Sequence, residues 1–289
     1  MPDPRILILT ADTGGGHRSV SESLAEAFQE AGQGGVVIVY AFRYLPGPLT
    51  QIPKLYLPTI NYASVFWRVM YYSLNRQLPG DFLMTKIIYA LSARALRRIY
   101  REHQPALVVS THPLFQYGAA RVLQGQYPGT PFATMVTDFA SAHRWWFTPL
   151  TDLCLLPSEE LRSVALANRI PPERIHVIGL PVHRAFSLNR YLTRQEARAA
   201  LGVSECPTLL IVGGGEGMGA LGEMAQAVDE SLPSMQKLIV AGRNRNLQRQ
   251  LQARHWAGPT HVYGFVRNMP QLMRAADVIV TKAGPSTLS

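Results

Sequence analysis

The feature that most constrains the fold is a series of short, continuously apolar segments with helical patterns between them. Ile6-Leu-Ile-Leu9 and Leu209-Leu-Ile-Val212 are typical, because neither alternates between polar and apolar residues. A strand that is apolar on both sides must be covered on both sides, as in a parallel sheet with helices on its two faces. The sequence therefore predicts an α/β protein with doubly wound parallel sheets.

These segments form two series, each followed by its own helices. The first is Arg5–Thr10, Gly35–Ala41, Ala106–Ser110, Phe132–Thr137, Leu153–Leu156 and Ile175–Ile178; the second is Thr208–Val212, Lys237–Ala241, Thr260–Tyr263 and Val278–Thr281. A helix is expected from the N-cap Thr193, with Glu196 three residues on, to a stop at Gly202. A chain of 289 residues also exceeds what one core ordinarily serves. We expect two domains, residues 1–185 and 186–289, with a linker near residues 183–192.

The second series is shorter than the first. After its fourth strand the chain ends, and residues 281–289 are typical of a strand end, a Gly/Pro loop and the start of a helix. A domain does not normally end on the first turn of a helix. We therefore expect the second domain to be incomplete and the chain to be a fragment.

A glycine-rich loop follows the first strand of the first series. In Asp12-Thr-Gly-Gly-Gly-His-Arg-Ser19, three glycines let the backbone approach a ligand, and the expected helix Ser19–Glu30 offers free N–H groups to an anion. The loop matches neither the dinucleotide fingerprint nor a Walker A motif. His17 titrates in the range that proton transfer requires and lies at the ligand-binding edge of such a sheet. We interpret the loop as a functional site; the alternative is a tight turn whose glycines serve geometry alone.

A second glycine loop, Gly213-Gly-Gly-Glu-Gly-Met-Gly219, occupies the same place in the second series, so two ligand-binding edges are expected. His112 and Asp138 also follow strands of the first series, Asp138 either as a site residue or as a turn residue. His143 is expected to be a polar loop residue. His, Cys, Asp and Glu show no metal-ligand spacing and no Asp-x-Asp occurs, so a phosphate would meet backbone amides and basic side chains.

Residues 42–100 differ in composition from the rest of the chain. They contain eleven aromatic residues, and their eight cations against one acid account for seven of the nine net positive charges. Helices are expected at Val65–Leu74 and Phe82–Tyr100, and an irregular loop at Leu45–Pro58. Aromatic helices flanked by cations are typical of binding to an anionic membrane surface. The alternative is a helical pair packed on the sheet; nucleic acid is less favoured because no binding module is present.

The rest of the chain shows no targeting or membrane-spanning signal. The N-terminal apolar stretch is too short for a signal peptide, and no apolar run of about eighteen residues occurs. Cys154 and Cys206 are too few for a disulfide framework or a four-thiolate zinc site. We expect a cytoplasmic protein, peripheral on the inner face of the cell membrane.

Taken in order, four motifs resemble those of the monogalactosyldiacylglycerol synthases and the processive diacylglycerol glucosyltransferases. They are Asp12-Thr-Gly-Gly-Gly-His-Arg-Ser19, Gly213-Gly-Gly-Glu-Gly-Met-Gly219, Gly264-Phe-Val-Arg-Asn-Met269 and Thr281-Lys-Ala-Gly-Pro285. The resemblance covers residues 6–289 and extends to the N-acetylglucosaminyltransferase that completes lipid II. It implies a GT-B fold of two Rossmann-like domains and an inverting, metal-independent glycosyltransferase without a cofactor.

The resemblance also implies roles for individual residues. His17 is the candidate base, and Asp138 and His143 lie in the acceptor-side motif, where Asp138 is a second catalytic candidate. Residues 42–100 correspond to the membrane-binding and acceptor-entry region. The acidic residue that binds the ribose is expected beyond Ser289. The donor UDP-sugar is expected to contact Gly14, Gly15, Gly16, Gly214, Gly215, Glu216, Met218, Arg243, Phe265, Val266, Gly284, Pro285, Ser286 and Thr287.

The expected reaction is transfer of galactose or glucose from UDP-galactose or UDP-glucose to diacylglycerol at an anionic membrane surface. Three alternatives remain open: an N-acetylglucosamine transferase with a polyprenyl-linked acceptor, a nucleotide-sugar epimerase on the same fold, and an inactive, truncated membrane-associated protein. The choice of hexose, processivity and oligomeric state are not set by these motifs.

Overall fold

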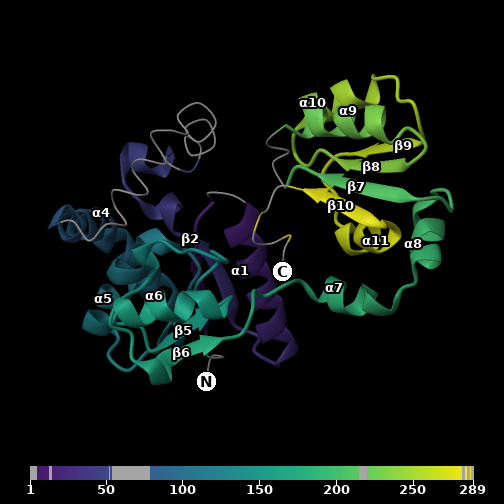
Figure 1. Ribbon diagram of the computed structural model, residues 1–289. Coiled ribbons are helices and arrows are strands. Elements are labelled where there is room, and N and C mark those ends of the chain that lie inside the picture. Colours follow the sequence, from purple (N-terminus) through teal and green to yellow (C-terminus); the bar gives the residue numbers. More distant parts are fainter. Residues whose placement is uncertain are drawn as a thin grey trace. The chain divides into compact units, whose positions relative to one another are not determined.

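The structure is a computed structural model that describes residues 5–12, 15–51, 53, 79–214, 220–281, 284 and 287. The chain divides after Val182 into two compact units, each built on one parallel sheet (Figure 1). The predicted boundary at residue 185 lies three residues further along the chain.

The first unit contains a six-stranded parallel sheet with the order β2-β1-β3-β4-β5-β6. Each strand lies within two residues of its predicted bounds, because continuous apolar runs set both its place and its extent. The strands are β1 (Ile6–Thr10), β2 (Val36–Tyr40), β3 (Leu107–Ser110), β4 (Phe132–Met135), β5 (Leu153–Leu156) and β6 (Ile175–Val177).

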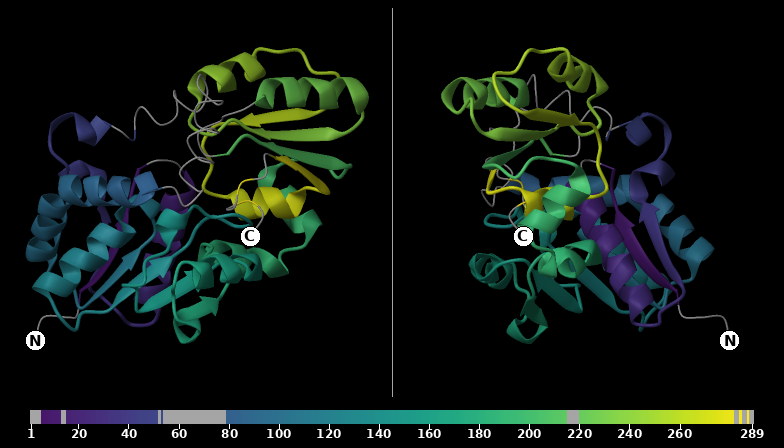
Figure 2. Two further views of the ribbon diagram at one scale, coloured as in Figure 1. Left: turned by 60° about the vertical axis from the view of Figure 1, so that its left-hand side comes forward. Right: turned by 90° about the vertical axis from the view of Figure 1, so that its right-hand side faces the viewer.

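Helices cover both faces of this sheet, as Figure 2 shows. They are α1 (Gly15–Glu30), α4 (Pro79–His103), α5 (Gln116–Gln126) and α6 (Arg162–Ala167). Successive residues of β1 point to opposite faces: Leu7 packs in the core cluster with α4 and α5, whereas Ile8 packs in the cluster with Val20 of α1. Burial on both faces explains why β1 has no polar side.

The second unit contains a four-stranded parallel sheet with the order β10-β7-β8-β9. Leu210 packs with the helices on one face and Ile211 with those on the other, so this sheet is also covered twice. Its strands are β7 (Thr208–Val212), β8 (Gln236–Val240), β9 (Thr260–Tyr263) and β10 (Val278–Thr281). Its helices are α8 (Arg194–Leu201), α9 (Leu221–Ser231), α10 (Arg245–Gln252) and α11 (Met269–Ala275), and α7 (Arg184–Leu188) precedes them.

Two helices begin earlier than the sequence predicts. α1 starts at Gly15 rather than Ser19, so two of the three glycines lie in its first turn. α4 runs from Pro79 to His103 rather than from Phe82 to Tyr100. The predicted helix at residues 65–74 lies outside the described residues, and the predicted loop at 45–58 is described only in part, with a 3-10 helix at Gly47–Gln51.

The start and end of α8 follow the predicted signals. Thr193 accepts from the Glu196 backbone N–H while the Glu196 carboxylate accepts from the Thr193 N–H, which completes a capping box. Gly202 ends the helix in the left-handed region at φ 66°.

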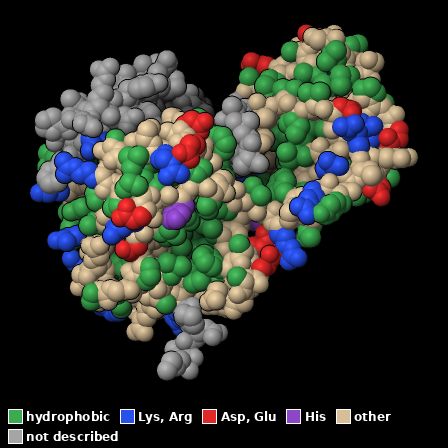
Figure 3. Space-filling view, turned by 60° about the horizontal axis from the view of Figure 1, so that its bottom comes forward, with side chains coloured by type: hydrophobic (Ala, Val, Ile, Leu, Met, Phe, Trp, Pro, Cys, Tyr) green, Lys and Arg blue, Asp and Glu red, His purple; other side chains and the backbone are tan. Residues whose placement is uncertain are grey.

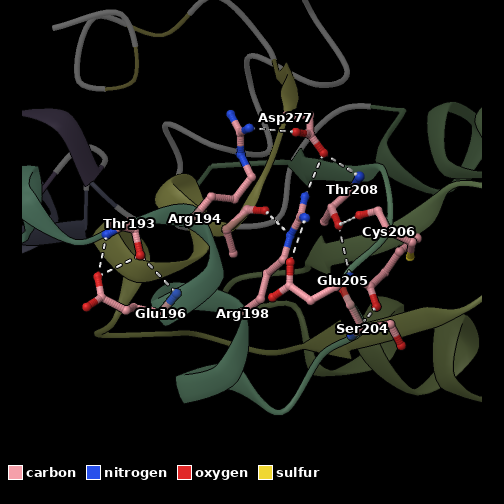
Figure 4. Close-up of polar contacts among 11 residues, drawn as sticks. Thr193, Arg194, Glu196, Arg198, Ser204, Glu205, Cys206, Thr208 and Asp277 are labelled. Carbon is pink, nitrogen blue, oxygen red and sulfur yellow. Dashed lines mark hydrogen bonds and ion pairs between the residues drawn. The ribbon is translucent and has the colours of Figure 1, made fainter.

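The buried Arg198 ties α8 to the sheet (Figure 4). Its guanidinium donates to the Ala275 carbonyl at 3.0 Å and to the Asp277 carboxylate at 2.7 Å, and it approaches Glu205 at 3.3 Å. Asp277 also accepts from the Thr208 backbone N–H at 2.8 Å. Arg198 thus connects α8 to the end of α11 and, through Asp277, to the first residue of β7.

Charged side chains are sparse on the face seen in Figure 3, where isolated blue and red groups lie between broad hydrophobic and uncharged areas. This agrees with a composition in which only 16% of residues are charged. Within the part of the chain that the structure describes, no helix is both long and apolar enough to cross a bilayer.

Candidate active site

His17 lies in the first turn of α1, where the sequence predicts a functional residue, and contacts two neighbouring strand ends. Its Nδ1 atom is 2.9 Å from the carbonyl oxygen of Thr111, directly after β3, and 2.9 Å from the hydroxyl of Thr137, after β4. Because β1, β3 and β4 are adjacent and parallel, their carboxyl ends share one edge of the sheet.

The Thr111 contact determines the tautomer of His17. A carbonyl oxygen only accepts hydrogen bonds, so Nδ1 carries the ring proton and donates it to Thr111. Nε2 then carries the lone pair, and it has no hydrogen-bond partner within the described part of the chain. His17 can therefore accept a proton at Nε2 while Nδ1 stays fixed.

The environment of His17 disfavours its charged form. The His112 ring lies 4.8 Å away and the Trp146 ring 5.9 Å away, measured between centroids. Burial lowers the pKa of His17 from 6.5 to about 4, although the bond to the Thr111 carbonyl opposes the shift. Burial also lowers the pKa of His112, with a smaller contribution from His17. At neutral pH the His17 imidazole is therefore uncharged. The sequence predicts titration near neutral pH, and burial accounts for the lower pKa.

Asp138 contacts Trp146 and the backbone of its own loop. Its carboxylate accepts the Trp146 indole N–H at 2.7 Å. Burial raises the pKa of Asp138, while hydrogen bonds from the Trp146 side chain and the His143 backbone oppose the rise. Asp138 thus fixes the indole that packs near His17, and its own catalytic role stays a prediction.

The two other candidate histidines are buried. His112 accepts from the Leu114 backbone N–H at 3.4 Å, and His143 accepts from that of Trp145 at 3.2 Å. Each caps a short 3-10 helix, Pro113–Phe115 and Arg144–Trp146. His143 lies in a loop, as predicted, but it is buried, and its ring is 4.7 Å from that of Trp145.

A charged cluster lies beside the glycine loop. Asp12 forms ion pairs with Arg18 of α1 and, at 3.4 Å, with Arg43. The Arg43 guanidinium lies 4.5 Å from the centre of the Tyr40 ring. At Gly15 a Cβ atom would meet nothing within 4 Å, so the backbone there is open to close approach.

The first unit also contains a groove of about 520 Å³. Its lining includes Pro113 and Leu114, which follow His112 in the chain, and Trp145, which precedes Trp146. The Trp145 indole N–H is buried and has no acceptor among the described residues. The remaining lining includes three cations and three more aromatic rings: Lys86, Arg144, Arg169, Tyr89, Tyr117 and Phe147.

Helix α4 lines this groove with Thr85, Lys86, Ile88 and Tyr89, and its exposed residues change from apolar to basic along the helix. Its first half exposes Leu83 (60%), Met84 (38%), Ile87 (42%) and Leu91 (47%). The second half exposes arginines, namely Arg94, Arg97, Arg98 and Arg101. We call the four apolar residues the α4 stripe.

The second unit brings together some of its predicted site residues. Arg243 follows β8 and Phe265 follows β9, and the guanidinium lies 4.2 Å from the ring centre. Gly214 follows β7 with φ 77°, which a residue with a Cβ rarely adopts. Val266 packs against the core cluster of α8 and α11. These positions share the carboxyl edge of the sheet.

The structure describes some of the predicted donor-site residues but not all of them. Gly15, Gly16, Gly214, Arg243, Phe265, Val266, Gly284 and Thr287 are described; Gly14, Gly215, Glu216, Met218, Pro285 and Ser286 lie outside the described residues. The donor roles of all these residues stay predictions. Among the described residues, no group of three or more His, Cys, Asp or Glu side chains could hold a metal ion.

Two families match separate parts of the chain. A model described as monogalactosyldiacylglycerol (MGDG) synthase matches residues 17–182. The glycosyltransferase family 28 C-terminal domain matches residues 208–289. The first match covers more than half of the 289 residues and includes His17, the groove and α4.

Curated relatives match along almost the whole chain. The chloroplastic monogalactosyldiacylglycerol synthase of Spinacia oleracea is 35% identical over 99% of this chain and 56% of its own length. Monogalactosyldiacylglycerol synthase 1 of Arabidopsis thaliana is 34% identical over 99% of this chain and 55% of its own. The chain therefore spans little more than half the length of these relatives.

Solved structures with the same fold are more distant in sequence. The Neisseria meningitidis UDP-GlcNAc 2-epimerase bound to UDP-GlcNAc has a TM-score of 0.56 at 16% identity, covering 97% of this chain and 78% of its own. Acinetobacter baumannii MurG has a TM-score of 0.52 at 15% identity, covering 99% and 74%. These matches show the GT-B fold of two Rossmann-like units.

Proposed function

Because the chain belongs to the monogalactosyldiacylglycerol synthase family, we propose that it transfers galactose or glucose from a UDP-sugar to diacylglycerol. One observation carries the proposal: His17 has its proton held at Nδ1 and its lone pair at Nε2. Such a residue suits removal of a proton from an acceptor hydroxyl. The rings of His112 and Trp146 lie near His17, and their chain neighbours Pro113 and Trp145 line a groove with apolar and basic residues.

In the proposed step, the diacylglycerol oxygen bonds to the anomeric carbon of the sugar while His17 Nε2 takes the hydroxyl proton. The bond between that carbon and the UDP oxygen breaks, and UDP leaves with the electron pair. Attack opposite the leaving group inverts the anomeric carbon. We expect the diphosphate charge to be met in the second unit by basic side chains, among them Arg243, so the proposal includes no metal and no cofactor.

The acceptor is a membrane lipid, and the α4 stripe supports access from a bilayer surface. Four exposed apolar side chains at helical spacing, followed by arginines on the same helix, suit an interfacial helix on anionic lipid. Each nearby cation contributes roughly 1 kcal/mol to such binding. We propose that the protein is peripheral on the inner face of the cell membrane and reaches the acceptor through the groove.

The activity test uses radiolabelled UDP-galactose and UDP-glucose with diacylglycerol in anionic vesicles. We expect glycolipid with at least one donor, and its loss by a hundredfold or more in His17→Ala. His176→Ala is the matched control, because His176 is an exposed histidine in the same unit. Absence of glycolipid with both donors, together with transfer from UDP-N-acetylglucosamine to a polyprenyl-linked acceptor or lipid-free epimerisation, would favour the corresponding alternative.

The membrane test is co-sedimentation with vesicles of phosphatidylglycerol and phosphatidylcholine. Ile87→Asp with Leu91→Asp should weaken binding at least tenfold, because two apolar side chains no longer enter the interface. Leu188→Asp, at a leucine of α7 that is 61% exposed, should bind like the parent protein. Equal binding of all three proteins would remove the α4 stripe from the proposal.

A further inference from the structure

We propose that Thr137 is a positioning residue for His17, holding the imidazole from a second side so that Nε2 keeps one direction and one protonation state. The inference rests on the proposed function only for its catalytic consequence. Its structural content, the orientation and tautomer of His17, is measurable without turnover.

The Thr111 carbonyl, the first hydrogen-bond partner of His17 Nδ1, is held rigidly in place. This carbonyl, which accepts the hydrogen bond from Nδ1–H, belongs to a fully buried residue. The Thr111 N–H donates to the Leu9 carbonyl at 2.9 Å. The Thr111 hydroxyl bonds to Thr10 and Ser21, each at 2.9 Å. Ser21 also donates to the carbonyl of His17 at 2.8 Å. The first turn of α1 is therefore tied to the end of β3 through buried hydroxyl groups.

One hydrogen bond alone would not fix the ring. The imidazole could still pivot about its single contact at Nδ1, which would swing Nε2 through an arc. The Thr137 hydroxyl, 2.9 Å from the same nitrogen and 5% exposed, supplies a second oxygen on a different strand end. The two oxygens, from the residues Thr111 and Thr137 that follow β3 and β4, leave one ring orientation in which the Nδ1 proton is shared between them.

The chemistry of Thr137 differs from that of a carboxylate at this position. A carboxylate beside Nδ1 would favour the imidazolium and hold a proton on the base. A hydroxyl is neutral, so it orients the ring without adding charge. It still accepts from Nδ1–H after Nε2 has taken the acceptor proton, and therefore supports both states of the base.

The other charged and titratable groups around His17 do not hydrogen-bond to its Nδ1 atom in the described part of the chain. His112 contacts the ring from the end of β3. The Asp138 carboxylate accepts the Trp146 indole N–H, and the His143 ring makes an edge contact with that of Trp145. From β1 and α1, Asp12 pairs with Arg18. Within the described residues, the Nδ1 atom is contacted by the Thr111 and Thr137 oxygens.

The first experiment removes the hydroxyl. Thr137→Val should lower kcat about three- to tenfold with KM unchanged, as expected for one lost hydrogen bond to the base. Thr137→Ser should restore kcat to within about twofold. Thr134→Val is the matched control: Thr134 is buried in β4 and bonds Gln116 and Thr151 instead of His17. Equal kcat values for the two valine variants would overturn the inference.

The second experiment introduces a charge and needs no activity. By NMR of ¹⁵N-labelled histidine, His17 in the parent protein should be the Nδ1–H tautomer and should titrate near pH 4. Thr137→Asp should raise its pKa above 6.5, whereas the isosteric Thr137→Asn should leave it near that of the parent. An unchanged pKa in Thr137→Asp would overturn the inference. A shifted pKa in a protein without glycosyl transfer would refute the proposed function and support the positioning of His17.

Discussion

Replacing Arg198 by methionine should destabilise the second unit far more than the same change at Arg194. Both arginines lie on α8, one turn apart, and both pair with Asp277, at 2.7 Å and 3.1 Å. They differ in exposure: the Arg198 side chain is 8% exposed and that of Arg194 is 52% exposed. The two substitutions therefore compare a buried and an exposed arginine that pair with the same carboxylate, Asp277.

The expected cost follows from what Arg198→Met leaves behind. The Ala275 carbonyl loses its guanidinium donor, and Asp277 loses its closest cation. Breaking a buried pair costs about 3–5 kcal/mol. Asp277 is about one-third exposed and keeps the Thr208 N–H and Arg194, so we expect about 3 kcal/mol. Arg194→Met should cost about 0.2–1 kcal/mol, the range of exposed ion pairs.

The assay is hydrogen exchange with mass spectrometry in increasing urea, which adds no salt to screen the charges. Peptides from β7 and β10 report the second unit, and peptides from β1 and β3 of the first unit serve as an internal control. Arg198→Met should lower protection in the second unit only. Equal losses in the two methionine variants, or a loss below about 0.5 kcal/mol in Arg198→Met, would refute the argument that the buried fork stabilises this unit.

Three further predictions concern stability, measured by urea unfolding. Gly258→Ala should cost about 1–3 kcal/mol, because a Cβ there would overlap a backbone carbonyl, whereas Gly222→Ala meets only ordinary contact and should be neutral or slightly stabilising. Lys237→Met should cost about 3 kcal/mol, because it strands the buried Asp229, 2.8 Å from the ammonium; adding Asp229→Asn should recover part of the loss, and no recovery would contradict the ion-pair argument. The pKa of His17 is lower in the folded chain than in the unfolded chain, so the unfolded chain binds more protons between pH 6.5 and 4, and stability should fall as pH falls through this window. His17→Gln should reduce the loss between pH 7 and pH 5 by up to about 2 kcal/mol, and an unchanged pH dependence would contradict the lowered pKa.

Most of the fold could be predicted from the sequence because strands buried on both faces leave an unambiguous pattern. All ten strands lie within two residues of their predicted bounds. The start of α1 was predicted less well. Glycine is a poor helix former, so the loop was expected to run to Ser19, yet Gly15 and Gly16 already lie in the helix. Contacts of His17 and Ser21 with Thr111, at the end of β3, hold this part of α1 and outweigh the low helix propensity of glycine.

The sequence marks His17 by its neighbouring glycines, and His112 and Asp138 by their places after strands, but it does not reveal the hydrogen-bond partners of His17. Its partners are 94 and 120 residues away in the chain. Thr111 and Thr137 look like ordinary residues at strand ends, and a contact between them and His17 requires the strand order β1-β3-β4, which the sequence does not determine. A weak signal was present, since threonine ends or follows β1, β3 and β4, at Thr10, Thr111 and Thr137.

The two cysteines differ in burial, which allows one of them to be labelled selectively. Cys154 is fully buried in β5, and burial raises the pKa of its thiol to about 12, so it forms almost no thiolate at neutral pH. Cys206 is half-exposed in the second unit. A maleimide fluorophore should therefore modify Cys206 alone, without any cysteine having to be removed, and would report on the second unit of the unaltered chain.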